Sequence, residues 1–75
     1  VVETSLLTGP EGSALVLVNY TYKPVEKLTV DLRLDHPVAR AESCEHGAIA
    51  VEKTENGVRL TLPLDWTDIV LLPRK

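Results

Sequence analysis

Cys44 and His46 are the first pair of side chains whose types and spacing could support chemistry. They lie two positions apart, which on a strand places both on one face, and Asp35 and His36 lie shortly upstream. A thiolate nucleophile with its base, or a metal site with a carboxylate, uses these residue types. The set lacks the repeated ligand spacing of zinc motifs. We therefore interpret Cys44 as a small buried thiol beside a turn histidine.

Two aspartates form a second candidate, because two nearby carboxylates can serve as the acid and base of a glycosidase. Asp65 and Asp68 flank Trp66 in the segment LPLDWTD. Short Asp side chains beside a strand end commonly accept hydrogen bonds from backbone amides, so we interpret both as turn residues. Ser13, Ser43 and the two histidines match no nucleophile motif, and no glycine-rich phosphate loop occurs. We predict no catalytic residue, no metal ligand and no cofactor.

The aromatic residues are the third candidate, because sugar-binding modules use aromatic rings as flat stacking platforms. Tyr20, Tyr22 and Trp66 are the only aromatics of the chain. Tyr20 and Tyr22 are two apart and are expected to share a strand face. For Trp66 two interpretations stay open: the single large plug of a core made of Val and Leu, which we favour, or an exposed platform.

Composition limits the classes of partner. The 75 residues carry a net charge of −3, with 25% charged and 44% hydrophobic residues. Without a basic patch or an apolar run of about 20 residues, we expect no nucleic-acid partner, no membrane span and a soluble protein. One cysteine excludes an internal disulfide and leaves the compartment open. The chain opens on Val rather than Met, so we expect a piece of a larger protein.

Hydrophobic periodicity predicts strands throughout. Apolar residues alternate with polar ones in three segments, as in a strand with one solvated face. Two further segments are apolar on both faces, the first of them as far as Val18. This pattern predicts a central strand or one whose outer face a neighbour covers. The alternating segments are 28–34, 58–64 and 49–51, the two-faced segments are 13–22 and 69–72, and weaker strands are expected at 2–8 and 38–43.

Turn residues separate these strands by short connections. Asn56-Gly57 is the strongest signal, because both residues tolerate the positive φ angles of a type I′ turn, and it predicts a two-residue hairpin between 49–55 and 58–64. Short connections cannot make parallel crossovers. We therefore predict one all-β domain over residues 1–75, an antiparallel β-sandwich of six to seven short strands, immunoglobulin-like or similar.

Two stretches, LVLVNYTYKPVEKLTVDLRL and GVRLTLPLDWTDIVLL, carry a family resemblance. They resemble the small β-sandwich domain that closes many bacterial multidomain glycoside hydrolases and related sugar-active proteins, after a TIM-barrel catalytic domain. In that pattern an apolar-Leu-Pro-Leu strand, a polar turn and Asp-apolar-apolar-Leu end the chain, as in Leu62–Leu64 and Asp68–Leu71. The resemblance implies a C-terminal domain that packs against the catalytic domain and carries no catalytic residue.

Three functions follow from these features. The first is a non-catalytic accessory domain whose partner is the catalytic domain of the same parent chain, which predicts an exposed apolar patch on one sheet face. The second is a carbohydrate-binding module that uses Tyr20, Tyr22 or Trp66. The third is an immunoglobulin-like protein-interaction module with 25–34 as a free edge strand.

Overall fold

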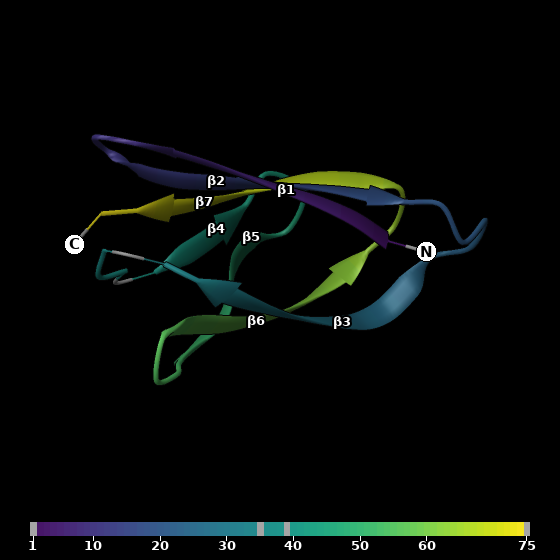
Figure 1. Cartoon of the computed structure of the whole chain (residues 1–75). Coiled ribbons are helices and arrows are strands. Elements are labelled where there is room, and N and C mark those ends of the chain that lie inside the picture. Colours follow the sequence, from purple (N-terminus) through teal and green to yellow (C-terminus); the bar gives the residue numbers. More distant parts are fainter. Residues whose placement is uncertain (1, 35, 39, 75) are drawn as a thin grey trace.

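The computed structural model describes residues 2–34, 36–38 and 40–74, which form seven antiparallel strands and no helix (Figure 1). The predicted all-β class and antiparallel pairing are confirmed, with the upper of the two strand counts. Within the described residues, no helix has the length and hydropathy that a membrane crossing requires. The strands are β1 (Val2–Gly9), β2 (Gly12–Asn19), β3 (Val25–Arg33), β4 (Ala41–Ser43), β5 (Gly47–Lys53), β6 (Gly57–Leu64) and β7 (Thr67–Pro73).

The strands form one sheet in the order β1-β2-β7-β4-β5-β6-β3, which leaves β1 and β3 as its edges. β5 bends the sheet, because its first residues pair with β4 and its last residues pair with β6. Figure 1 shows the result: β1, β2 and β7 lie on one side of the molecule, β3 and β6 lie on the other, and β4 and β5 connect them. The sheet is therefore curled like half a barrel around its core.

The core fills the concave side of this sheet with aliphatic side chains. Along β6 the buried residues alternate with outward-facing ones, as the sequence predicts. Across from them, Leu28, Val30 and Leu32 of β3 face Leu62, Leu60 and Val58 in register. A strand with period two places every second residue on one face. The buried core residues are Leu15, Leu17, Ala41, Val58, Leu60, Leu62, Leu64, Val70 and Leu72.

The hairpin between β5 and β6 pairs as predicted, but its turn lies one residue earlier. The Thr54 amide donates to the carbonyl of Gly57 over 3.0 Å, so Glu55 and Asn56 are the two loop residues. A type I′ turn needs positive φ at its two loop residues. In the described chain positive φ occurs at Gly12, Tyr22 and Gly47 instead, so the type I′ prediction is wrong. The physical reason is the adjacent strand β3: a Cβ on Gly57 would overlap the carbonyl oxygen of Leu32, so this glycine permits close strand packing.

Two predicted strands are shorter than expected. β2 ends at Asn19 instead of Tyr22, because the Asn19 side chain takes over the hydrogen bonds of the following backbone. β4 begins at Ala41, and upstream of it Val38 forms only an isolated bridge with Arg74. The part of the predicted 38–43 strand at position 39 lies outside the described residues.

Candidate functional site

All three aromatic side chains lie on the surface. Tyr20, Tyr22 and Trp66 are 56%, 92% and 53% exposed. The favoured interpretation of Trp66 as a core plug is therefore wrong. The core is filled instead by aliphatic side chains, mostly leucine and valine, from several strands.

The aromatic residues occupy two turns that Asn19 fastens together at one end of the sheet. The Asn19 side-chain amide donates to the carbonyls of Lys23 and Asp65, both over 2.8 Å. Its backbone amide donates to the carbonyl of Trp66 over 2.7 Å. Asn19 is 6% exposed, so these bonds are shielded from water. The turn after β2 and the turn before β7 are thereby held as one unit, which we call the aromatic end.

Tyr22 has an unusual backbone conformation. Its φ is 66°, the only positive φ at a non-glycine residue in the described chain. Thr21 leads into it by donating from its amide and its hydroxyl to the Asn19 side-chain oxygen over 2.8 and 2.6 Å. The predicted common strand face of Tyr20 and Tyr22 is wrong, because both residues lie in this turn.

Substituting Asn19 tests how far this clamp holds the aromatic end. Asn19→Asp keeps an oxygen for Thr21 but removes the donor for Lys23 and Asp65, so we expect a loss of about 2 kcal/mol in the free energy of unfolding. Urea unfolding measures the loss, and Thr21→Val serves as the partial variant with a smaller effect. Equal stability of Asn19→Asp and the natural chain would show that the clamp contributes nothing.

Asp65 and Asp68 occupy different environments. Asp65 is exposed in the turn, whereas Asp68 is buried on β7. The Asp68 carboxylate accepts from the Ser43 hydroxyl and from the amides of Glu45 and Ile69, the latter two over 3.2 and 2.7 Å. Asp68 therefore lies on a strand rather than in the turn where it was expected, and its carboxylate binds the distant β4–β5 turn.

The Cys44 and His46 candidate is also placed in that turn. Both residues are exposed in the turn between β4 and β5, so His46 is a turn histidine as expected, whereas the expectation of a buried Cys44 thiol is wrong. The His46 amide donates to the Ser43 hydroxyl oxygen over 2.9 Å, which helps to set the turn. Asp35 lies outside the described residues. Within the described part of the chain, no group of three or more potential ligands is placed to hold a metal ion.

His36 forms a buried pair with Ser13 that sequence reasoning missed. The Nδ1 atom of His36 lies 3.1 Å from the carbonyl of Pro37 and donates to it, because a carbonyl oxygen only accepts. The Nε2 atom is hydrogen-bonded to the Ser13 hydroxyl over 2.8 Å. Thr8 extends the chain of hydroxyls over 3.0 Å. Ser13 and His36 are each 6% exposed. The pair fastens the segment after β3 to β2, and its 23-residue separation gives no local sequence signal.

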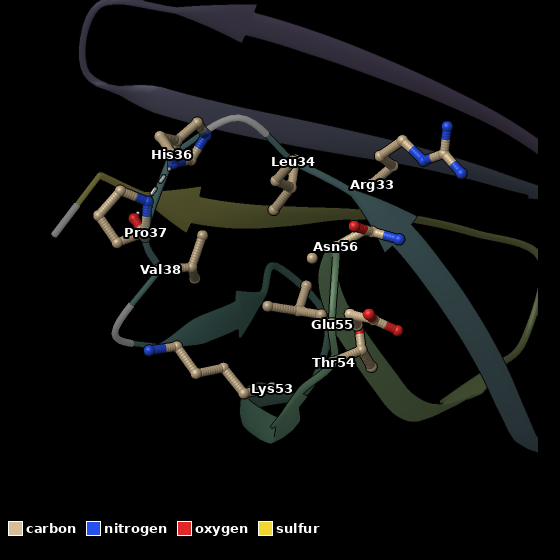
Figure 2. Close-up of a pocket in the computed structure, with 11 residues that line it drawn as sticks. Arg33, Leu34, His36, Pro37, Val38, Lys53, Thr54, Glu55 and Asn56 are labelled. Carbon is tan, nitrogen blue, oxygen red and sulfur yellow. Dashed lines mark hydrogen bonds between the residues drawn. The ribbon is translucent and has the colours of Figure 1, made fainter.

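A polar pocket lies beside His36, at the end of β3 away from the aromatic end. Figure 2 shows it between the segment after β3 and the β5–β6 turn, with Arg33, Lys53 and Glu55 among its lining side chains. The hydrogen bond from His36 to Pro37 lies at its margin. The predicted aromatic site residues do not line this pocket.

The two outer faces of the curled sheet differ in chemistry. On the face of β3, β5 and β6, Arg59 contacts Asp31 over 2.7 Å and Glu52 over 3.9 Å. The hydrogen bond and charge of Asp31 raise the pKa of Arg59. Charged cross-strand pairs of this kind suit a face in contact with water.

The outer face of β1, β2 and β7 is apolar. Register pairs Leu7 with Ala14 and Ala14 with Leu71, and it pairs Val16 with Ile69 in the next row. Leu7 is 63% exposed, and Ile69 and Leu71 are also exposed. We call this surface the outer apolar patch; it consists of Leu7, Ala14, Val16, Val18, Ile69 and Leu71.

The chain is thus an all-β domain with an aromatic end, a charged outer face and an apolar outer face. Comparison with protein-family models, with curated proteins and with solved structures finds no match.

Proposed function

We propose that this chain is a non-catalytic accessory domain of a larger glycoside hydrolase. It packs against the catalytic domain of the same parent chain and stabilises it, while the chemistry belongs to that catalytic domain. The observation that carries the proposal is the outer apolar patch, which an accessory domain needs for docking. The resemblance of LPLDWTDIVLL to the final strands of such domains supports the choice of parent.

We infer that the curled sheet is a β-sandwich of the immunoglobulin-like kind, with β1, β2, β7 and β4 as one layer and β6 and β3 as the other. The support is that the inward residues of both halves contribute to one core cluster, as the facing sheets of a sandwich do. The bend within β5 connects the two layers.

β2 gives the strongest argument for a covered face. Its inward residues Leu15 and Leu17 are buried, and its outward residues Val16 and Val18 are also apolar and only half-buried. An antiparallel sheet with one solvated face has polar residues on that face, as β6 has at Arg59. An apolar outer face that water would touch is unfavourable, so a partner surface covers it.

Charges around the patch indicate the kind of partner. Glu3 pairs with Val18 and Glu42 pairs with Leu71 in register, and Glu45 lines a hollow with Ile69. All three glutamates are exposed. A docking surface with an apolar centre and Lys or Arg at its rim complements this pattern. A second copy of the chain presents the same acidic rim, so the catalytic domain is the better occupant.

The protein-interaction alternative has weaker support. β3 is an edge strand, as strand addition requires. It carries Glu26, Lys27, Asp31 and Arg33 as exposed charges, and its register with β6 shifts between Val25 and Leu28. Charges and bulges are the features that protect edge strands from pairing. The geometry of β3 therefore disfavours addition of a partner strand.

The proposal predicts binding in trans. The isolated domain, titrated by calorimetry into a parent chain truncated to remove it, should bind, and Leu71→Lys should abolish that binding. A cation at Leu71 places a desolvated charge in the apolar interface and faces a cationic rim.

Thr29→Lys is the matched control, because Thr29 is an exposed strand residue on the charged outer face. It should bind as the natural domain does. Equal affinity of the Leu71 and Thr29 variants would contradict docking through the outer apolar patch.

A further inference from the structure

We propose that the aromatic end is a binding site for a neutral oligosaccharide, with Tyr22 and Trp66 as stacking platforms. The aromatic end adjoins the outer apolar patch at Val18 but shares no residue with it, so this inference goes beyond the docking function. Its first support is the distribution of aromatic side chains. The largest fully buried side chains are leucines and one valine, whereas both tyrosines and the tryptophan are at least half exposed at one end.

The second support is the rigidity of this end. Asn19 binds Lys23 and Asp65 through its side chain and Trp66 through its backbone, with donor–acceptor distances between 2.7 and 2.8 Å. The Thr21 hydroxyl donates to Asn19 and also lies 2.9 Å from the carbonyl of Lys23. Turns whose backbone is fixed before the ligand arrives lose little conformational entropy on binding.

The third support is the backbone of Tyr22. A left-handed φ of 66° suits glycine or asparagine, and a bulky residue is strained there. Packing does not explain the tyrosine, since its side chain is 92% exposed. A strained residue with an exposed aromatic ring is a feature that points to function rather than to folding.

The chemistry of the surroundings favours a saccharide. The apolar C–H face of a pyranose packs on an aromatic ring, while its hydroxyls need hydrogen-bond partners at the ring edge. Asp65 and Lys23 are exposed sequence neighbours of Trp66 and Tyr22 and can supply acceptors and donors. Single-stranded nucleic acid also stacks on aromatic rings, but it needs a cationic groove, and the chain has a net charge of −3.

An NMR titration of the isotope-labelled 75-residue chain tests the proposal. The probes are β-1,4-linked hexasaccharides of glucose, xylose, mannose and galactose at millimolar concentration. We expect at least one of them to shift the Trp66 indole and the amides of 20–23. Trp66→Ala should weaken that binding about tenfold or more, because stacking on one ring contributes on that scale.

Tyr22→Asn separates binding from folding. Asparagine tolerates a left-handed φ and has no ring, so the variant should unfold at a higher temperature and bind the saccharide about tenfold more weakly. Tyr22→Phe retains the ring face and should keep most of the affinity. Three results would each overturn the proposal: no shift with any probe, shifts confined to other surfaces, or undiminished binding by Tyr22→Asn. None of these results bears on docking, which uses a different face.

Discussion

Replacing Gly12 with alanine should remove a large part of the domain's free energy of unfolding. Gly12 begins β2 with a φ of 142°, a conformation that residues with a Cβ rarely adopt. A Cβ there would lie 2.5 Å from the carbonyl oxygen of Leu72 and 2.7 Å from the amide nitrogen of Arg74. Both atoms belong to the backbone of the neighbouring segment, so relief requires β2 and β7 to separate.

The expected loss is about 3 to 5 kcal/mol, from the strained dihedral together with the backbone overlap. A domain of this length has a total stability of roughly 4 to 11 kcal/mol, so the loss is a large part of it. Circular dichroism with urea measures the effect. Gly9→Ala is the matched control in the same turn, because its Cβ would meet no atom within 4 Å. Similar stability of the two variants would contradict the described pairing of β2 with β7.

Leu60→Ala should cause the second large loss, about 3 kcal/mol in the free energy of unfolding. Leu60 is completely buried and lies in register between Val30 of β3 and Val51 of β5. Removing its side chain leaves a cavity that these strands cannot close. The midpoint of thermal unfolding should fall by roughly 10 to 25 °C.

Leu7→Ala is the control for Leu60→Ala, because the same side chain is removed from an exposed position on the outer apolar patch. In the isolated chain it should change stability by about 0.5 kcal/mol or less. A comparable loss in both variants would mean that the outer face is already covered, and the docking proposal would lose its main support.

The sequence predicts the strands well where one face is solvated. The alternation at 58–64 follows from simple geometry, because each inward Leu of β6 lies opposite an inward residue of β3 or β5. β2 was harder to interpret, since a strand that is apolar on both faces indicates coverage without showing what covers it. Only the sheet order shows that the outer side of β2 faces away from the rest of the chain.

The errors arise where contacts between distant segments decide local structure. The loop residues are Glu55 and Asn56 instead of Asn56 and Gly57, because β3, which is distant in sequence, packs closely against Gly57. β2 ends at Asn19 instead of Tyr22 because the Asn19 side chain forms a hydrogen bond with the carbonyl of Asp65, which is 46 residues away in the sequence. The prediction of a buried Trp66 fails because composition alone does not show that aliphatic residues form the core.

For the candidate sites, too, the sequence indicates residue types, whereas their positions depend on contacts between distant segments. The aromatic residues could be identified from composition, but their exposure and their clamping by Asn19 required the fold. The Ser13–His36 pair joins segments with no shared motif, so residue spacing could not have found it. The outer apolar patch was expected as a consequence of docking, and its residues became known only from the register of three strands.

Scanning calorimetry of the proposed parent chain tests docking through the outer apolar patch most directly. The comparison is between the natural parent chain and one with Ile69→Lys and Leu71→Lys, two exposed positions of the outer apolar patch. Docking predicts that the catalytic domain unfolds several degrees lower in the variant, while the isolated 75-residue chain keeps its own midpoint. An unchanged midpoint of the catalytic domain would contradict the account, because the patch would then stabilise nothing in the parent.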